Sequence, residues 1–131
     1  HPYLTTPEHT ERARAILGPG PLLAPEQMVL LETDPARARE TARRSVRYYL
    51  ELPNYVASLR ELGFGDEDLT GGGSDRLIDA LVAWGDEAAI AARVRDHLDA
   101  GADHVCVQPL DASLAGQLGQ LRRLAGRLLA A

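Results

Sequence analysis

VAWGDEAAIAARVRDHLDAGADHVCVQPL, residues 82–110, contains one short strand, one helix and one buried strand in an uninterrupted unit. Asp86 stands where an N-cap is expected, and Gly101 stands where a glycine ends a helix. The residues His104–Gln108 then form the second strand. A helix that leads into a buried strand is the repeating unit of a parallel α/β fold.

Spacing within this unit predicts which side chains are buried. Ile90, Val94 and Leu98 recur every four residues and indicate the packed stripe of the helix, so His97 is expected to be exposed. In the strand, apolar and polar residues alternate. One face is therefore apolar, and the other carries His104, Cys106 and Gln108.

The composition is typical of a soluble globular protein. The chain has 131 residues with a formal net charge of -5 and one cysteine. A nucleic-acid surface needs an excess of Lys and Arg, a disulfide framework needs paired cysteines, and a membrane span needs about 20 apolar residues. We expect a cytoplasmic protein without nucleic-acid or membrane partners. Because the chain starts at His1 and not at methionine, we also expect it to be a fragment.

The rest of the chain extends the strand–helix pattern. Residues 1–4 are extended in character and precede a helix with Thr6 as N-cap and Pro7 at its first position. QMVLLET, residues 27–33, is the clearest strand, and Asp34 caps the next helix. The last helix is predicted to pack through Leu114, Leu118, Leu121, Ala125 and Leu128. The pattern predicts a single domain over residues 1–131.

Two features raise the question of phosphate binding. Arg39, Arg43 and Arg47 recur every four residues on the helix after Asp34. A solvated outer face with local ion pairs is their more ordinary interpretation. The triple glycine at residues 71–73 lacks the Lys and the Ser or Thr of a P-loop, so we interpret it as a flexible connection or part of a lid.

Five segments in this order carry a family resemblance: HPYLTTPEHT, LLETDPARARETAR, LPNYVASLRELGF, GGGSDRLIDALVAWGD and LDAGADHVCVQ. Together they resemble the carboxyl-terminal half of luciferase-like monooxygenases, in particular the oxidoreductases that use the deazaflavin coenzyme F-420. The resemblance covers essentially the whole chain. It implies half of a (β/α)8 TIM barrel, with about four parallel strands and outer helices, since a whole barrel needs about 250 residues.

The resemblance also implies a function. In that family one barrel binds FMN or the deazaflavin at the carboxyl-terminal mouth of its strands, and a hydride moves between the ring and a small organic substrate. The family's amino-terminal half is absent from the 131 residues, so the chain alone is not expected to catalyse. The alternative is a non-catalytic half-barrel that assembles with another chain or with itself, because its open sheet edges expose unpaired backbone groups.

Several side chains would line the mouth of the completed barrel. Hydroxyl and amide groups at such positions can hydrogen-bond a cofactor or substrate, and a helix N-terminus favours an anion. For Thr6 simple capping is the more ordinary role, and His9 is equally well placed for the surface. The candidate cofactor-binding residues are Tyr3, Thr5, Thr6, His9, Thr33 and Gln108.

The remaining reactive side chains have ordinary interpretations. Cys106 shares a strand face with His104 and is expected to be a small buried core residue. Trp84 is either core or a wall for a flat ring. No HExxH or GxSxG motif occurs, so no metal site is predicted and no catalytic residue is assigned. The substrate and the choice between FMN and the deazaflavin are also left open.

Overall fold

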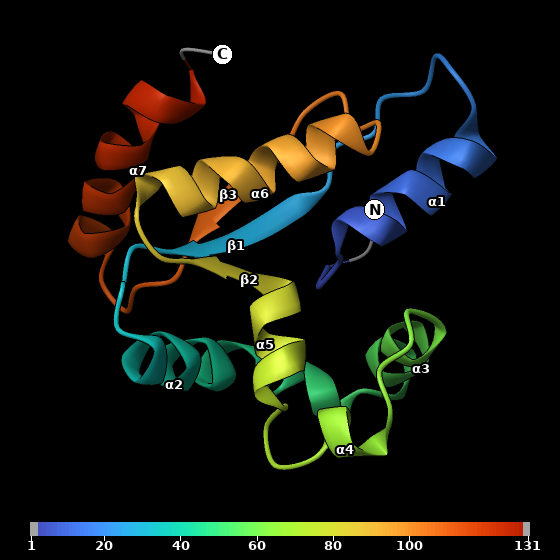
Figure 1. Ribbon diagram of the computed structural model, residues 1–131, viewed down its shortest axis with the longest axis horizontal. Coiled ribbons are helices and arrows are strands. Elements are labelled where there is room, and N and C mark those ends of the chain that lie inside the picture. Colours follow the sequence, from blue (N-terminus) through green and yellow to red (C-terminus); the bar gives the residue numbers. More distant parts are fainter. Residues whose placement is uncertain (1–2, 130–131) are drawn as a thin grey trace.

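The computed structural model describes residues 3–129 and has a parallel three-stranded sheet with helices on both faces (Figure 1). The strands are β1 (Glu26–Leu30), β2 (Val82–Trp84) and β3 (Cys106–Pro109). The helices are α1 (Pro7–Leu17), α2 (Pro35–Val46), the short 3-10 helix η1 (Tyr49–Glu51), α3 (Pro53–Glu61), α4 (Asp66–Leu69), α5 (Asp75–Leu81), α6 (Glu87–Asp99) and α7 (Leu114–Leu128). None of the described helices combines the length and apolarity that crossing a bilayer requires.

The middle strand of the sheet is β1, and the strand order is β2-β1-β3. Met28 of β1 lies opposite Val82 of β2 on one side and Gln108 of β3 on the other. The connection from β1 to β2 and the connection from β2 to β3 therefore run in opposite directions across the sheet. Because parallel crossovers are right-handed, opposite directions place their helices on opposite faces. In Figure 1, α6 lies along one face, and α2 and α5 lie on the other.

The predicted α/β class and parallel pairing are confirmed, but the half-barrel of about four strands is not. Consecutive barrel strands pair in chain order, whereas β1 here separates β2 from β3. The first strand was predicted at residues 1–4, of which residues 1 and 2 lie outside the described part. Tyr3 and Leu4 form a bend, and Leu4 has a left-handed φ of 58°, which a strand cannot accommodate.

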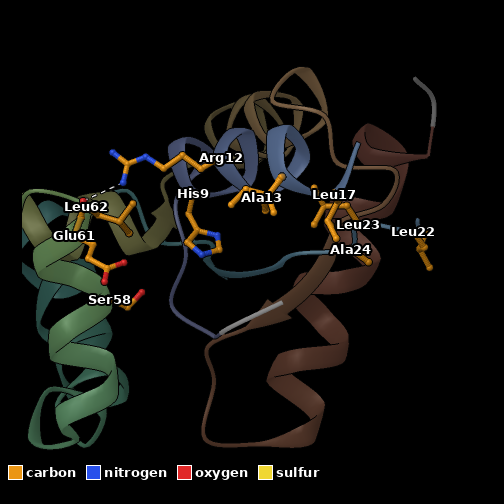
Figure 2. Close-up of a pocket in the computed structure, with 11 residues that line it drawn as sticks. His9, Arg12, Ala13, Leu17, Leu22, Leu23, Ala24, Ser58, Glu61 and Leu62 are labelled. Atoms are coloured by element: carbon orange, nitrogen blue, oxygen red, sulfur yellow. Dashed lines mark hydrogen bonds between the residues drawn. The ribbon is translucent and has the colours of Figure 1, made fainter. Parts of the chain in front are cut away.

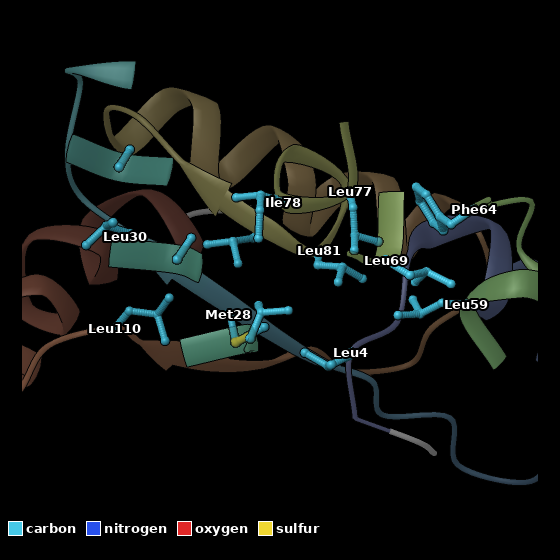
Figure 3. Packing of buried hydrophobic residues seen from close by; sticks show 14 residues of the cluster. Leu4, Met28, Leu30, Leu59, Phe64, Leu69, Leu77, Ile78, Leu81 and Leu110 are labelled. Atoms are coloured by element: carbon cyan, nitrogen blue, oxygen red, sulfur yellow. The ribbon is translucent and has the colours of Figure 1, made fainter. Parts of the chain in front are cut away.

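Alternate side chains of β1 supply the two halves of the core. Met28 and Leu30 pack with buried residues of α2 and α5, including Ala38 and Leu77 (Figure 3). On the other face, a smaller apolar cluster forms around β1 and β2, and its members are Val29, Ala83, Ile90 and Leu124. The continuous apolar run at residues 27–33 is thus explained by a strand that is buried on both faces.

Local capping signals position the helix starts as the sequence predicts. The side chains of Asp34, Ser74, Asp86 and Ser113 each accept a hydrogen bond from a backbone N–H in the first turn of α2, α5, α6 and α7, respectively. Thr6 occupies the N-cap of α1, but its side chain makes no capping hydrogen bond. The caps fix where the chain enters each helix.

Arg44 pairs with Glu40 at 2.9 Å on α2, which is the local ion pair that the solvated-face interpretation predicts. Two other arginines of α2 form ion pairs with α5. Arg39 binds Asp79 at 2.6 Å, and Arg43 pairs with Asp75. Asp79 also accepts a hydrogen bond of 2.8 Å from Trp84 Nε1, so the partly buried indole is tied to the same network. These contacts tie α2 to α5 and neutralise Arg39 and Arg43, two of the three arginines on which the phosphate interpretation depends.

Two predicted apolar stripes are wrong in part. On α6, Ile90 is buried as predicted, but His97 is also fully buried and Leu98 is 40% exposed. On α7, Leu124 is the buried residue, because it packs against β1 and α6. The α7 side chains that remain exposed instead are Leu114, Leu118 and Leu121. Helical spacing alone cannot choose between two adjacent stripes when leucines occupy both.

His97 is buried because both of its ring nitrogens have partners. Gln27 Nε2 donates to the carbonyl oxygens of Met28 and Leu81, at 2.8 and 3.0 Å, which leaves Gln27 Oε1 as an acceptor. His97 Nε2 therefore donates to Gln27 Oε1 at 3.0 Å, and His97 Nδ1 accepts from the Thr10 hydroxyl at 2.9 Å. This chain of contacts joins α1, α6 and β1, and a neutral imidazole satisfies it.

Burial, with a smaller effect from the nearby Arg93, lowers the pKa of His97 from 6.5 to about 4. As the pH falls, the unfolded chain therefore binds a proton at His97 before the folded chain does. The contribution of neutral His97 to the free energy of unfolding is complete above pH 6.5 and is lost as the pH falls toward 4. We expect the free energy of unfolding to fall by about 2 kcal/mol between neutral pH and pH 5. Urea unfolding at a series of pH values measures this loss.

The matched variants for this experiment are His97→Gln and His104→Gln. His97→Gln should flatten the pH dependence, whereas His104→Gln should leave it unchanged, because His104 is exposed. Equal slopes for the two variants would contradict the assignment of the titration to His97.

Candidate functional site

One face of β3 presents polar groups beside the main core. Cys106 lies opposite Glu26, and Gln108 lies opposite Met28, so these side chains share one face of the sheet. Cys106 is exposed, as is His104. The interpretation of Cys106 as a buried core thiol is therefore wrong: β3 is an edge strand, and within residues 3–129 no further strand pairs beyond it.

Tyr3 lies against this face and contacts β3 directly. Its hydroxyl donates a hydrogen bond to Gln108 Oε1. Burial, with Tyr49 and Glu26 nearby, raises the pKa of Tyr3 to about 12, so its hydroxyl keeps its proton at neutral pH. Within the described residues no hydrogen bond from the Gln108 amide nitrogen is present, and the side chain is exposed. Gln108 thus offers a free donor beside an aromatic ring.

The four tyrosines of the chain gather around this contact. The ring of Tyr49 is central, with ring centroids 4.8 Å from Tyr3, 5.1 Å from Tyr55 and 5.6 Å from Tyr48. We call these rings the tyrosine cluster. Sequence reasoning missed its role, although the segment 48–55 holds three of the four tyrosines and this enrichment was a usable signal. Such a cluster provides flat apolar surface with hydroxyl groups at its margins.

The candidate residues predicted from the sequence do not form one site. Tyr3 and Gln108 are in contact. Thr5 and Thr6 are buried where α1 begins, and the Thr5 hydroxyl has no hydrogen-bond partner among the described residues. Thr33 is exposed and follows β1, at the carboxyl edge of the sheet. Contacts of α1 with the C-terminal half of α6 place the α1 residues toward the opposite edge, where the strands begin.

His9 belongs to a separate groove of about 680 Å³ between α1, residues 22–24 and α3 (Figure 2). At one end, His9, Ser58 and Glu61 extend into the groove, and Arg12 Nη1 donates to the Glu61 carbonyl oxygen at 3.0 Å. Burial and the charge of Arg12 lower the pKa of His9, which favours the neutral imidazole. The apolar lining consists of Ala13, Ile16, Leu17, Leu22, Leu23, Ala24 and Leu62.

A second hollow, of about 440 Å³, lies at the carboxyl ends of β1 and β3. In open α/β sheets ligands bind at this kind of position, where neighbouring strands connect in opposite directions. Here Gln120 of α7 bridges the two strand ends. Its Oε1 accepts from the backbone N–H of Leu31 at 2.9 Å, and its Nε2 donates to the Leu110 carbonyl oxygen at 3.2 Å. The amide of Gln120 is therefore engaged in holding the two strand ends together.

The charged residues of that hollow are also engaged. Arg37 binds Glu32 at 2.9 Å, and its hydrogen bonds, with that of the Asp34 backbone, lower the pKa of Glu32 to about 2. Arg123 binds Glu87 at 2.6 Å. Elsewhere within residues 3–129, no group of three or more His, Cys, Asp and Glu side chains has a metal-binding arrangement. Of the sites described, the Tyr3–Gln108 contact has the clearest free polar group beside aromatic surface.

Comparison with known proteins gives no match: no family model, no curated protein and no solved structure is similar to this chain. The luciferase-like resemblance therefore stays a prediction from the sequence, and the functional argument depends on the geometry.

We expect Gln120→Ala to lower the free energy of unfolding by about 1–3 kcal/mol, because it leaves the polar groups of Leu31 and Leu110 without partners between β1 and β3. Gln117→Ala on the same helix is the control, since Gln117 makes one exposed hydrogen bond to the Asp111 carbonyl oxygen. Urea unfolding compares the two variants. If Gln117→Ala lowers the free energy of unfolding as much as Gln120→Ala does, the bridge contributes no more stability than a single exposed hydrogen bond, and the prediction is wrong.

Proposed function

We propose that the chain is the carboxyl-terminal part of a luciferase-like oxidoreductase whose tyrosine cluster and Gln108 hold the ring of a deazaflavin, coenzyme F-420, or of FMN. The observation that carries the proposal is the hydrogen bond between Tyr3 and Gln108, which joins two of the predicted cofactor-binding residues beside an aromatic surface. The sequence resemblance is the second support.

The residues fit a planar heteroaromatic ring in two respects. The free Gln108 amide is a donor for a ring carbonyl oxygen, and the rings of Tyr3 and Tyr49 offer surface for stacking. The Tyr3 hydroxyl donates a hydrogen bond to Gln108 Oε1, so the amide nitrogen of Gln108 points away from Tyr3. When bound, such a cofactor supplies hydride transfer to or from a small organic substrate. The chain's part is to orient the ring and exclude water from one of its faces.

The proposal places the unit within an eight-stranded barrel that other strands complete. In a (β/α)8 barrel the strands pair in chain order, so β2 would lie between β1 and β3, which pair directly in this structure. The proposal therefore requires this pairing to change when the other strands complete the barrel. The Gln108 side chain is exposed, so one face of a bound ring would stay open to water. We therefore expect the chain to bind the cofactor without turnover.

Calorimetric titration with the deazaflavin and with FMN, alongside Trp84 fluorescence, tests this proposal. We expect saturable binding of at least one cofactor. Gln108→Ala and Tyr49→Ala should each weaken it about tenfold, because they remove a hydrogen bond and a stacking surface worth roughly 1–3 kcal/mol. Thr33→Ala is the control and should bind as the unmodified chain does. Absence of binding by both cofactors, or an equal loss in Thr33→Ala, would overturn the proposal.

A second candidate function is a non-catalytic module that assembles through its uncovered surfaces. Cys106 and Leu110 direct their backbone N–H groups to Pro25 and Val29, so the alternate residue Val107 turns its backbone toward the free edge of β3. On α7, Leu114 is 71% exposed, and Leu118 and Leu121 continue the same stripe. An open edge next to apolar surface favours pairing with another chain.

Light scattering over a range of concentrations tests the assembly. If the module function holds, the mass should be twice 14.2 kDa or more at high concentration, and Leu118→Glu should reduce it to a monomer. Leu22→Glu is the control, because Leu22 is 74% exposed but lies away from α7. A monomer at all concentrations would exclude self-assembly as the function of these surfaces.

A further inference from the structure

The groove between α1 and α3 has the features of a small-molecule site and takes no part in the proposed function. Its volume of about 680 Å³ lies within the range of roughly 300–1,000 Å³ that is usual for ligand sites. Its walls come from three segments, α1, residues 22–24 and α3. Arg12 joins α1 to α3 through the Glu61 carbonyl oxygen, and Asp103 Oδ2 accepts from both Arg14 of α1 and the backbone N–H of Leu23. The walls are thus fixed relative to one another before any ligand binds.

Most of the groove is apolar and open to solvent. Ile16 is 85% exposed and Leu22 is 74% exposed, and both line this groove together with Leu17. Single exposed apolar residues are ordinary on a protein surface, but several around one concavity indicate a surface that is covered when the protein works. The apolar part can take an aliphatic body.

The polar end of the groove carries no net charge. Arg12 and Glu61 are of opposite sign, and the lowered pKa of His9 favours its neutral form. Ser58 adds a hydroxyl group that can donate and accept. In Figure 2 the side chains of His9, Ser58 and Glu61 lie toward one end of the groove, and Leu17, Leu22 and Leu23 lie toward the other. A charged ligand group would meet one like and one opposite charge at this end and so gain no net attraction, although it would still lose hydration. An uncharged hydrogen-bonding group does not lose the hydration of a charge.

We propose that this groove binds an uncharged amphipathic molecule, with its hydroxyl or amide head at His9, Ser58 and Glu61 and its aliphatic body along Ile16, Leu17 and Leu22. Charge balance at the polar end selects the head group, and the apolar lining selects the body. The site is separate from Tyr3 and Gln108, so it binds whether or not those residues hold a cofactor.

Three probes with the same body and different heads test the proposal: 1-octanol, octanoate and octylamine. Calorimetry or nuclear magnetic resonance titration of the intact chain should show saturable binding of octanol. Octanoate and octylamine should bind at least tenfold more weakly, because each brings one uncompensated charge to the polar end. Equal affinity for the three probes, or no saturation with octanol, would overturn the proposal.

A matched pair of variants locates the binding. Ala13→Leu puts a larger side chain into the groove and should abolish octanol binding, whereas Ala15→Leu on the same helix is exposed and outside the lining, so it should change nothing. Gln108→Ala should also leave octanol binding intact, which separates this site from the cofactor site. Unchanged binding in Ala13→Leu, or a dimer seen by light scattering that Ala13→Leu dissolves, would show that the groove has another occupant.

Discussion

The double pairing of β1 determines where the other elements lie. Because β1 has a parallel partner on each side, the two crossover connections run in opposite directions across the sheet. Right-handed crossovers then place helices on both faces. Met28 and Val29, adjacent in the sequence, consequently face different apolar clusters. The apolar run that makes β1 recognisable in the sequence follows from this position, because a strand in the middle of a covered parallel sheet has no solvent-facing side.

A polar residue within such a strand needs internal partners. Gln27 is fully buried in β1, and its amide is satisfied by two backbone carbonyl oxygens and by His97. His97 in turn binds Thr10, which attaches α1 to α6. The position of α1 fixes the start of the described chain, and Tyr3 is thereby held against the open face at Gln108. The candidate site thus depends on a buried hydrogen-bond chain that contains none of its residues.

Local signals in the sequence predict local structure well. Asp34 and Asp86 cap the helices that they were expected to cap, because capping depends on residues within one turn. Strand order was not predictable in this way, since it depends on pairing between segments distant in the chain. The resemblance to a barrel supplied a sequential order, and the structure has β1 between β2 and β3.

Only part of the candidate site could be predicted, because its residues come from segments that are distant in the chain. Tyr3 and Gln108 were both named from their places near strand ends, and they do meet. Thr33 was named on the same ground, yet it lies at the carboxyl edge, away from that contact. Tyr49 was missed because its role arises from tertiary contacts with Tyr3 and Tyr55, which no local pattern encodes.

The central position of β1 is open to a direct measurement. Nuclear Overhauser contacts between backbone protons of the isotopically labelled chain report which strands are neighbours. The account predicts that Met28 of β1 shows cross-strand contacts with both Val82 and Gln108, and that β2 and β3 show none with each other. Contacts of Met28 with only one of these strands, or contacts between Val82 and Gln108, would contradict it.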